Sequence, residues 1–427
     1  MNHDWAQIWS SRAARNVGKL LSANVLAQVI GLLVYPILTR MYSPEDFGLF
    51  NLFLSIGGVL IIISTAQYQQ AVPIAGEEKE AKGAFFAGLL CLIGSCLLFS
   101  LLPFFATPVA NLFKVPELAE YLWLMPLYVF FLGVWQLLNN WYIRKKAFGQ
   151  ISIYQIGQNV LSAGGKLGFG YKTIAGGLLY GSVGAAVLAS LGTLVLGRKQ
   201  YIRDLRPCSF IAIKNAFHRF RNYPLYSLPS ELVNVINCNI AVWIITPLFG
   251  SEATGYYGMA MLLGFTPISI IATSIYQVLM QNISVKVNAR QPIGKVFYQY
   301  MKKCAILIIP SFSVLFILMP WLVKVVLGTG WEETAQMLRY FLPWFALFFF
   351  SIPWSFLPLL FEKQRINLWI EIAMILLRLT ILGLGGYWRN LTFVIIAYSA
   401  VSALVVMGQL LWYGRMVRVH DLGCPSK

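Results

Sequence analysis

Long apolar runs, separated by short polar segments, follow one another along the whole 427-residue chain. Each run has the length of about 20 residues that an α-helix needs to cross a bilayer core. The runs are continuous rather than alternating, which favours helices over a barrel. The predicted spans are residues 20–38, 47–72, 84–112, 121–142, 151–171, 174–197, 223–249, 256–278, 304–323, 340–361, 366–387 and 391–413. The sequence therefore predicts an all-α membrane protein with about twelve transmembrane helices.

Composition and charge agree with a membrane protein. Hydrophobic residues make up 58% of the chain and charged residues 11%, against about 25% charged residues in a soluble domain. The net charge of +17 does not indicate nucleic acid as a partner, because no soluble module carries a basic face. With cytoplasmic termini, Lys and Arg are about five times more frequent in inside segments than in outside loops. Both termini are therefore predicted to be cytoplasmic.

The polar segment at residues 198–222 is the longest loop, and it is basic. Residues 38–50 follow the first span and residues 245–257 follow the seventh; at a constant offset of 207, a Thr, a Glu and a Gly coincide. We interpret this as a duplication. Because six spans are an even number, both halves enter the membrane from the same side, and the repeat is parallel. The predicted organisation is two six-helix bundles around a central cavity, at residues 1–197 and 223–427, joined by a cytoplasmic linker at 198–222.

The segment LTRMYSPEDFGLF at residues 38–50 resembles the first-loop signature of polysaccharide flippases, which export O-antigen and related lipid-linked repeat units. These belong with multidrug extruders and lipid II flippases in the multidrug/oligosaccharidyl-lipid/polysaccharide exporter superfamily. The resemblance covers essentially the whole chain. It implies two bundles that alternate between inward-open and outward-open states in the bacterial inner membrane. It also implies an undecaprenyl-pyrophosphate oligosaccharide as cargo, with membrane lipids, a polysaccharide polymerase and assembly machinery as candidate partners.

Charged residues inside the spans are candidates for binding such a cargo, because a sugar-diphosphate head group cannot cross hydrocarbon unaided. Arg378 lies near the middle of the eleventh span, and Glu371 lies two turns earlier on the same face. Arg378 either meets the pyrophosphate or pairs with a carboxylate that holds helices together. Lys166 lies about one turn from the outer end of the fifth span, among glycines that permit close helix approach. It either extends to the lipid headgroups or binds cargo.

Polar residues at helical spacing mark the first and seventh spans, which the duplication relates. Asn24 and Gln28 lie in the first span, and Glu231 and Asn234 in the seventh. They either line the cavity and bind cargo or form hydrogen bonds between helices. Glu231 is the best candidate for binding a coupling proton or sodium ion, because an apolar environment favours a protonated carboxyl. The further candidates are Glu371 for ion coupling and, in the first outer loop, Arg40 for substrate binding, unless Arg40 serves as a helix cap or headgroup contact.

An enzyme would need an acid–base or metal cluster near one surface, and the sequence offers none. The six cysteines are scattered, and the three histidines lie outside the apolar runs, so neither a metal site nor a cofactor is predicted. The stronger alternative is a multidrug exporter of the same superfamily. Such an exporter favours acidic and aromatic groups for cationic drugs, whereas this chain offers intramembrane cations as well as carboxylates.

Overall fold

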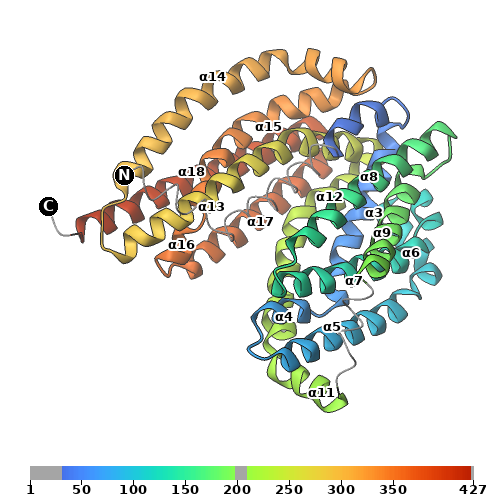
Figure 1. Cartoon of the computed structure of the whole chain (residues 1–427). Coiled ribbons are helices and arrows are strands. Elements are labelled where there is room, and N and C mark those ends of the chain that lie inside the picture. The colour runs from blue at the N-terminus through green and yellow to red at the C-terminus, as the bar shows by residue number, and fades with distance from the viewer. Residues whose placement is uncertain (1–30, 198–208, 425–427) are drawn as a thin grey trace. The chain divides into compact units, whose positions relative to one another are not determined.

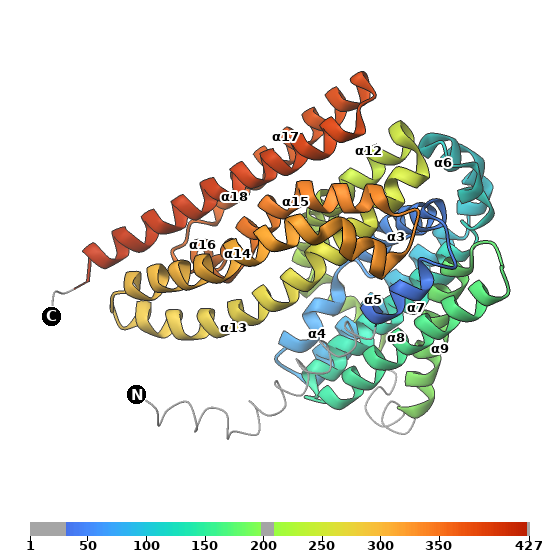
Figure 2. The ribbon, with the colours of Figure 1, turned by 90° about the horizontal axis from the view of Figure 1, so that it is seen from above.

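The computed structural model describes residues 31–197 and 209–424, and within these ranges every regular element is a helix (Figures 1 and 2). The all-α class is therefore confirmed. The long helices are α3 (Pro44–Ser64), α5 (Glu78–Phe99), α7 (Leu124–Arg144), α8 (Phe148–Tyr171), α9 (Gly177–Leu196), α12 (Leu228–Ala260), α13 (Thr266–Asn288), α14 (Gly294–Leu327), α15 (Glu332–Ser351), α17 (Gln364–Trp388) and α18 (Leu391–Leu422). The shorter ones are α4 (Ala71–Ile74), α6 (Ala106–Phe113), α11 (Phe210–Arg219) and α16 (Leu357–Leu360).

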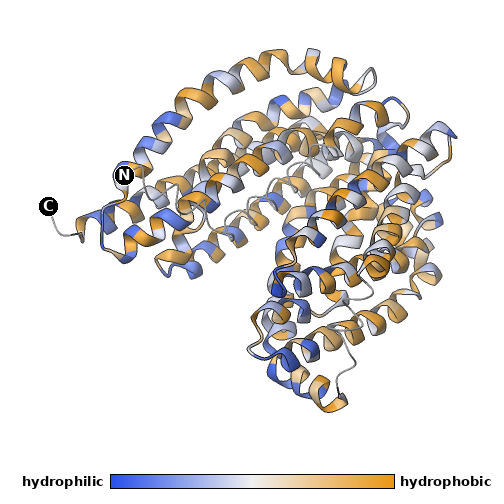
Figure 3. Cartoon of the chain, viewed as in Figure 1, coloured by the Kyte–Doolittle hydropathy of each residue, from blue (hydrophilic) through white to orange (hydrophobic). Residues whose placement is uncertain are grey.

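Eight stretches of the described residues are long and apolar enough to cross a membrane. One of them, Tyr223–Asn288, contains both the seventh and the eighth predicted spans. The helices α7 and α8 have the length of the fourth and fifth spans but are more polar, and most of the first predicted span lies outside the described residues. The multi-pass membrane fold predicted from the sequence is confirmed, and Figure 3 shows the apolar residues that dominate these helices.

Helix boundaries differ from the predicted spans in two ways. The helices α14 and α18 extend past the apolar runs. A helix makes its backbone hydrogen bonds within itself, so it can continue from the hydrocarbon into the aqueous layer. Two predicted spans are instead interrupted. The span at 47–72 breaks after α3, where Ala66 and Gln67 adopt positive φ, and the span at 84–112 breaks into α5, a short 3₁₀ turn with Pro103 and α6.

The chain forms two compact units, Met1–Ser251 and Glu252–Lys427. The boundary falls within α12, where Gly250 has a non-helical φ of 93° and interrupts the helix. Gly250 lies 207 positions after Ser43, the residue that precedes α3. The helix interruption therefore recurs at the offset of the predicted duplication. The division into bundles at residues 1–197 and 223–427 remains a prediction.

The start of α3 shows how the segment at residues 38–50 folds. Ser43 caps the helix: its side chain accepts from the Asp46 backbone N–H, and Asp46 accepts from the Ser43 backbone in return. Pro44 occupies the first turn, where its missing N–H is not needed. Gly48 lies against the main chain of Ser251, and an added Cβ would overlap the Ser251 carbonyl oxygen. The motif is therefore a helix start whose glycine permits a close backbone contact within the first unit.

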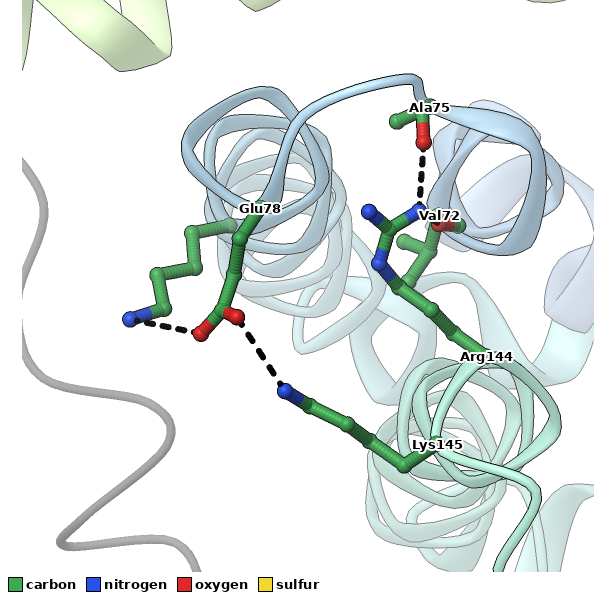
Figure 4. Close-up of polar contacts among 6 residues, drawn as sticks. Val72, Ala75, Glu78, Arg144 and Lys145 are labelled. Atoms are coloured by element: carbon green, nitrogen blue, oxygen red, sulfur yellow. Dashed lines mark hydrogen bonds and ion pairs between the residues drawn. The ribbon is translucent and has the colours of Figure 1, made fainter.

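Polar contacts fasten the ends of three helices in the first unit, as Figure 4 shows. Arg144, at the end of α7, donates to the carbonyl oxygens of Val72 at 3.2 Å and Ala75 at 2.5 Å, which belong to the last turn of α4 and its C-cap. Glu78 begins α5 and forms ion pairs of 3.3 Å with Lys82 and Lys145. Since a cation satisfies the free carbonyls of a helix C-terminus, these contacts fix α4 and α5 against α7.

Candidate functional site

Within residues 31–197 and 209–424, two charged side chains are buried, and both are cations. Lys166 on α8 is 8% exposed and Arg378 on α17 is 5% exposed. They lie in different units, one in Met1–Ser251 and one in Glu252–Lys427. Sequence reasoning had singled out both positions. Because a buried charge is costly in an apolar environment, each requires a specific stabilising environment.

The ammonium of Lys166 lies over an aromatic ring rather than at the end of its helix. Its Nζ is 4.5 Å from the centre of the Phe50 ring on α3, a distance at which a cation–π attraction operates. Among the described residues, no carboxylate and no hydrogen-bond acceptor contacts this Nζ. The positive charge is therefore buried inside the first unit, where it contacts an aromatic ring and forms no ion pair with the described residues.

A close approach between α8 and α9 fixes the backbone of Lys166. A Cβ added to Gly165 would meet Gly181 Cα at 3.0 Å, and one added to Gly181 would meet Lys166 N at 2.6 Å. The two glycines thus let the helices touch through their backbones, as predicted for the glycines around Lys166. The phenol of Tyr42 donates a hydrogen bond of 2.7 Å to the Lys166 carbonyl oxygen. Both contacts hold the main chain and leave the ammonium group for other interactions.

Tyr42→Phe tests the hydrogen bond to Lys166. Burial, followed by the nearby Asp46 carboxylate, raises the pKa of Tyr42 to about 12. The stabilising effect of the hydroxyl is therefore present below the ordinary pKa of 10 and is lost only as the pH rises through about 12. In thermal unfolding, we expect Tyr42→Phe to lower the stability of the protein by about 1 kcal/mol. The loss should be the same at pH 7 and at pH 9. Tyr171→Phe, at a position that is 86% exposed, is the control, and an effect of Tyr42→Phe that disappears at pH 9 would contradict this assignment.

Arg378 contacts side chains from two neighbouring helices. Its Nε and Nη2 donate to Ser402 Oγ on α18 at 3.2 and 3.0 Å. The guanidinium carbon lies 4.7 Å from the ring centre of Tyr398 on α18 and 5.4 Å from that of Trp344 on α15. The side chain therefore links α17 to α15 and α18. This geometry agrees with a role in holding helices together.

Ser402→Ala is expected to destabilise the second unit, because two charge-assisted hydrogen bonds from Arg378 are lost inside an apolar environment. The expected loss is about 1.5–3 kcal/mol, detected as a lower thermal unfolding midpoint. Ser313→Ala provides the control, since the Ser313 hydroxyl is exposed and donates only to Ile309 O of its own helix. Equal midpoints for the two variants would show that Ser402 does not hold Arg378 in place.

The candidate carboxylates lie in more exposed positions than the cations. Glu371 is exposed and accepts a 2.7 Å hydrogen bond from Asn367 on its own helix. Glu231 is half-buried in the first turn of α12, directly after a π-helical turn at Tyr223–Ser227. Asn234 is exposed one turn later. Glu371 and Arg378 share a helix face but differ in burial.

The remaining candidates are distributed as follows. Arg40 is exposed, and its guanidinium donates to the carbonyl oxygen of Pro36, a contact typical of a helix C-terminus. Asn24 and Gln28 lie outside the described residues.

Sequence reasoning missed a cluster of polar side chains at the end of α3. Thr65 donates to Gln69 at 2.6 Å, and the amides of Gln69 and Gln70 donate to Gln67 Oε1 at 3.1 and 2.7 Å. Thr65, Gln67 and Gln69 are buried, and Gln67 adopts the left-handed region with φ of 62°. The signal in the sequence was three glutamines at the end of an apolar run. The amide of Gln67 also donates to the carbonyl oxygen of Ile62 at 3.3 Å, so the cluster supplies a partner for a backbone group near the end of α3.

Comparison with known proteins identifies the family. The family model described as polysaccharide biosynthesis protein matches residues 37–336, so the chain belongs to that family. No curated protein matches the sequence. The family predicted from residues 38–50 is thereby confirmed.

Solved transporter structures share the fold. The lipid II flippase MurJ, in an inward closed conformation, is 17% identical with a TM-score of 0.73, covering 94% of this chain and 90% of that chain. An inward-facing multidrug resistance MATE family transporter of the MOP superfamily is 14% identical with a TM-score of 0.68, covering 93% of this chain and 96% of that one. A MOP superfamily transporter from Pyrococcus furiosus is 14% identical with a TM-score of 0.55, covering 95% of both chains. The chain therefore has the fold of MOP superfamily transporters.

Proposed function

We propose that this protein translocates an undecaprenyl-pyrophosphate-linked oligosaccharide, such as an O-antigen repeat unit, across the bacterial inner membrane by alternating access. Membership of a polysaccharide biosynthesis family and the fold shared with a lipid II flippase support a lipid-linked cargo. The inside bias of Lys and Arg supports cytoplasmic termini. The protein acts as a transporter and not as an enzyme.

The observation that carries this proposal is the sign of the buried charges. Lys166 and Arg378 are the two buried charged residues of the described ranges, whereas the candidate carboxylates Glu231 and Glu371 are half-buried and exposed. Cations inside a membrane attract a diphosphate and repel an organic cation. The charge distribution therefore favours an anionic cargo over the cationic drugs of a multidrug exporter.

Within this proposal the candidate residues have separate roles. Lys166 and Arg378 bind the diphosphate, and Asn24, Gln28 and Asn234 form hydrogen bonds with the sugars. Arg40 contributes a further cation to substrate binding. Glu231 and Glu371 bind the ion whose gradient drives transport, and the bundles at residues 1–197 and 223–427 are the moving bodies. The polyprenyl tail stays in lipid, which avoids moving a long apolar chain through a polar path.

Deletion of the gene in its own host tests the proposal against the multidrug alternative. We expect surface polysaccharide to be lost and the lipid-linked repeat unit to accumulate, accessible to a glycosidase only from the cytoplasmic side. Expression of the wild-type chain from a plasmid should restore the surface polymer. Unchanged surface polysaccharide, together with increased sensitivity to organic cations, would assign the chain to drug export.

A further inference from the structure

A pocket of about 580 Å³ lies within the second unit, between the end of α14 and the start of α15. Phe316, Pro320 and Val323 supply its apolar wall. Lys324 and Arg339 supply two cations, and Glu332 supplies one carboxylate. The pocket is separate from Arg378, which is not among its lining residues. It is a half-apolar, net cationic cavity to which the proposed transport mechanism assigns no role.

Arg339 is held in this pocket with an unsatisfied donor. Its guanidinium carbon lies 4.6 Å from the ring centre of Phe316, so the ring supports one face of the group. Its Nε is buried and has no hydrogen-bond partner among the described residues. Arg339 lines the pocket as a half-buried residue, so its delocalised positive charge and its further N–H donors are available to an anionic oxygen there. The arrangement therefore indicates an anionic ligand in the pocket.

The other charged groups of the pocket leave its positive potential in place. Glu332 is already engaged, since its Oε2 accepts the backbone N–H of Gly330 at 3.0 Å. Lys324 is exposed in the last turn of α14, and no carboxylate of the described residues forms an ion pair with it. Two cations around one cavity match the charge of a phosphate group better than that of a single neutral sugar.

The surface beside the pocket is suited to an acyl chain. Ile317, Trp321 and Val325 follow one another at intervals of four residues along α14, and they are 72%, 60% and 53% exposed. Residues at this spacing share one face of a helix. An apolar face leads to Lys324 at the end of the helix, and Figure 3 shows the hydrophobic colouring of α14 beyond its first turns. A ligand with a phosphate head and apolar chains matches both features.

We propose that this pocket binds the head group of an anionic phospholipid of the bilayer, with the phosphate between Arg339 and Lys324 and the acyl chains along the exposed face of α14. The bound lipid anchors the α14–α15 connection at the membrane surface that the topology predicts to be external. Anionic lipids bind where basic residues lie next to apolar helix surface. This site does not depend on the identity of the transported cargo.

Native mass spectrometry of the purified full-length protein tests the site by titration with phosphatidylglycerol. We expect Arg339→Gln to weaken the tightest binding by about tenfold, the effect of losing one charge-assisted contact. Lys324→Gln should also weaken it, and because Lys324 is exposed, this variant remains informative if Arg339→Gln does not fold. Arg389→Gln is the matched control, since Arg389 is an exposed cation at the predicted external end of α17.

Competitors identify the source of the phosphate. We expect zwitterionic phosphatidylcholine and free inorganic phosphate to displace phosphatidylglycerol poorly. Displacement by inorganic phosphate at similar concentrations would overturn it in favour of a free-anion site. Stronger binding of undecaprenyl phosphate would overturn it in favour of a carrier-lipid site, and equal binding by the wild type and both pocket variants would show that the pocket binds no lipid phosphate.

Discussion

Lys166→Gln is expected to slow translocation of a diphosphate-linked cargo by roughly thirtyfold, as expected for losing a charge-assisted contact of about 2 kcal/mol. The fold should be as stable as that of the wild type or more stable. The reason is that the Lys166 ammonium is buried over Phe50 without an ion pair from the described residues. Removing a buried charge that has no carboxylate partner relieves a desolvation cost. Transport rate and thermal midpoint are measured on the same preparations.

Lys172→Gln is the matched control for this experiment. Lys172 caps the same helix α8 but is exposed, so its neutralisation should change neither transport nor stability. A fall in the Lys166→Gln midpoint that parallels the loss of transport would make Lys166 a structural residue. An unchanged rate for Lys166→Gln would remove it from the cargo site.

Gly181→Ala is expected to lower the stability of the first unit, because the added methyl group meets main-chain atoms of a neighbouring helix. The added Cβ would lie 2.6 Å from Lys166 N and 2.9 Å from Gly165 C, which are main-chain atoms that cannot rotate away. The helices α8 and α9 must separate to admit it, at a cost of about 1–3 kcal/mol. Because the same movement displaces Lys166, transport should fall together with the thermal midpoint.

Gly184→Ala separates packing from helix propensity. Gly184 lies on the same helix α9, three residues further along, and a Cβ there would meet nothing within 4 Å. Alanine is favoured over glycine in a helix by about 1 kcal/mol, so this variant should be unchanged or slightly more stable. Equal destabilisation by Gly181→Ala and Gly184→Ala would contradict the close backbone contact between α8 and α9.

The membrane fold was predictable because it depends on local composition. Each apolar run must become a helix in lipid, whatever its neighbours are. The breaks within runs were not predictable in the same way. The residues Thr65, Ala66 and Gln67 include neither Gly nor Pro. Ala66 and Gln67 nevertheless adopt positive φ, beside a hydrogen-bonded cluster of glutamines. Such a cluster depends on side chains that meet only after folding.

The candidate site was predictable in part for a similar reason. Lys166 and Arg378 stand out as charges inside apolar runs, and both are buried. Their surroundings, the Phe50 ring and Ser402, come from other helices and could not be inferred from spacing. Spacing also placed Glu371 on the same helix face as Arg378. Burial along one face depends on which neighbouring helices cover each turn, and Glu371 is exposed whereas Arg378 is buried.

The pocket beside Arg339 was missed because it arises from the connection between two helices. In the sequence, Arg339 is the residue directly before the predicted span at 340–361. Its contact with Phe316 depends on how α14 packs against α15. Sequence periodicity describes each helix alone and does not specify which residues of neighbouring helices face one another.

The most direct test is the rate at which the purified protein flips fluorescent undecaprenyl-pyrophosphate oligosaccharide in proteoliposomes, with and without an ion gradient. Protein-free liposomes are the control, and efflux of an organic cation is measured in parallel. We expect flipping well above the protein-free rate, dependence on Lys166 and Arg378, and no efflux of the organic cation. Absence of flipping across several glycans, together with cation efflux, would contradict the proposed function and assign the chain to drug export.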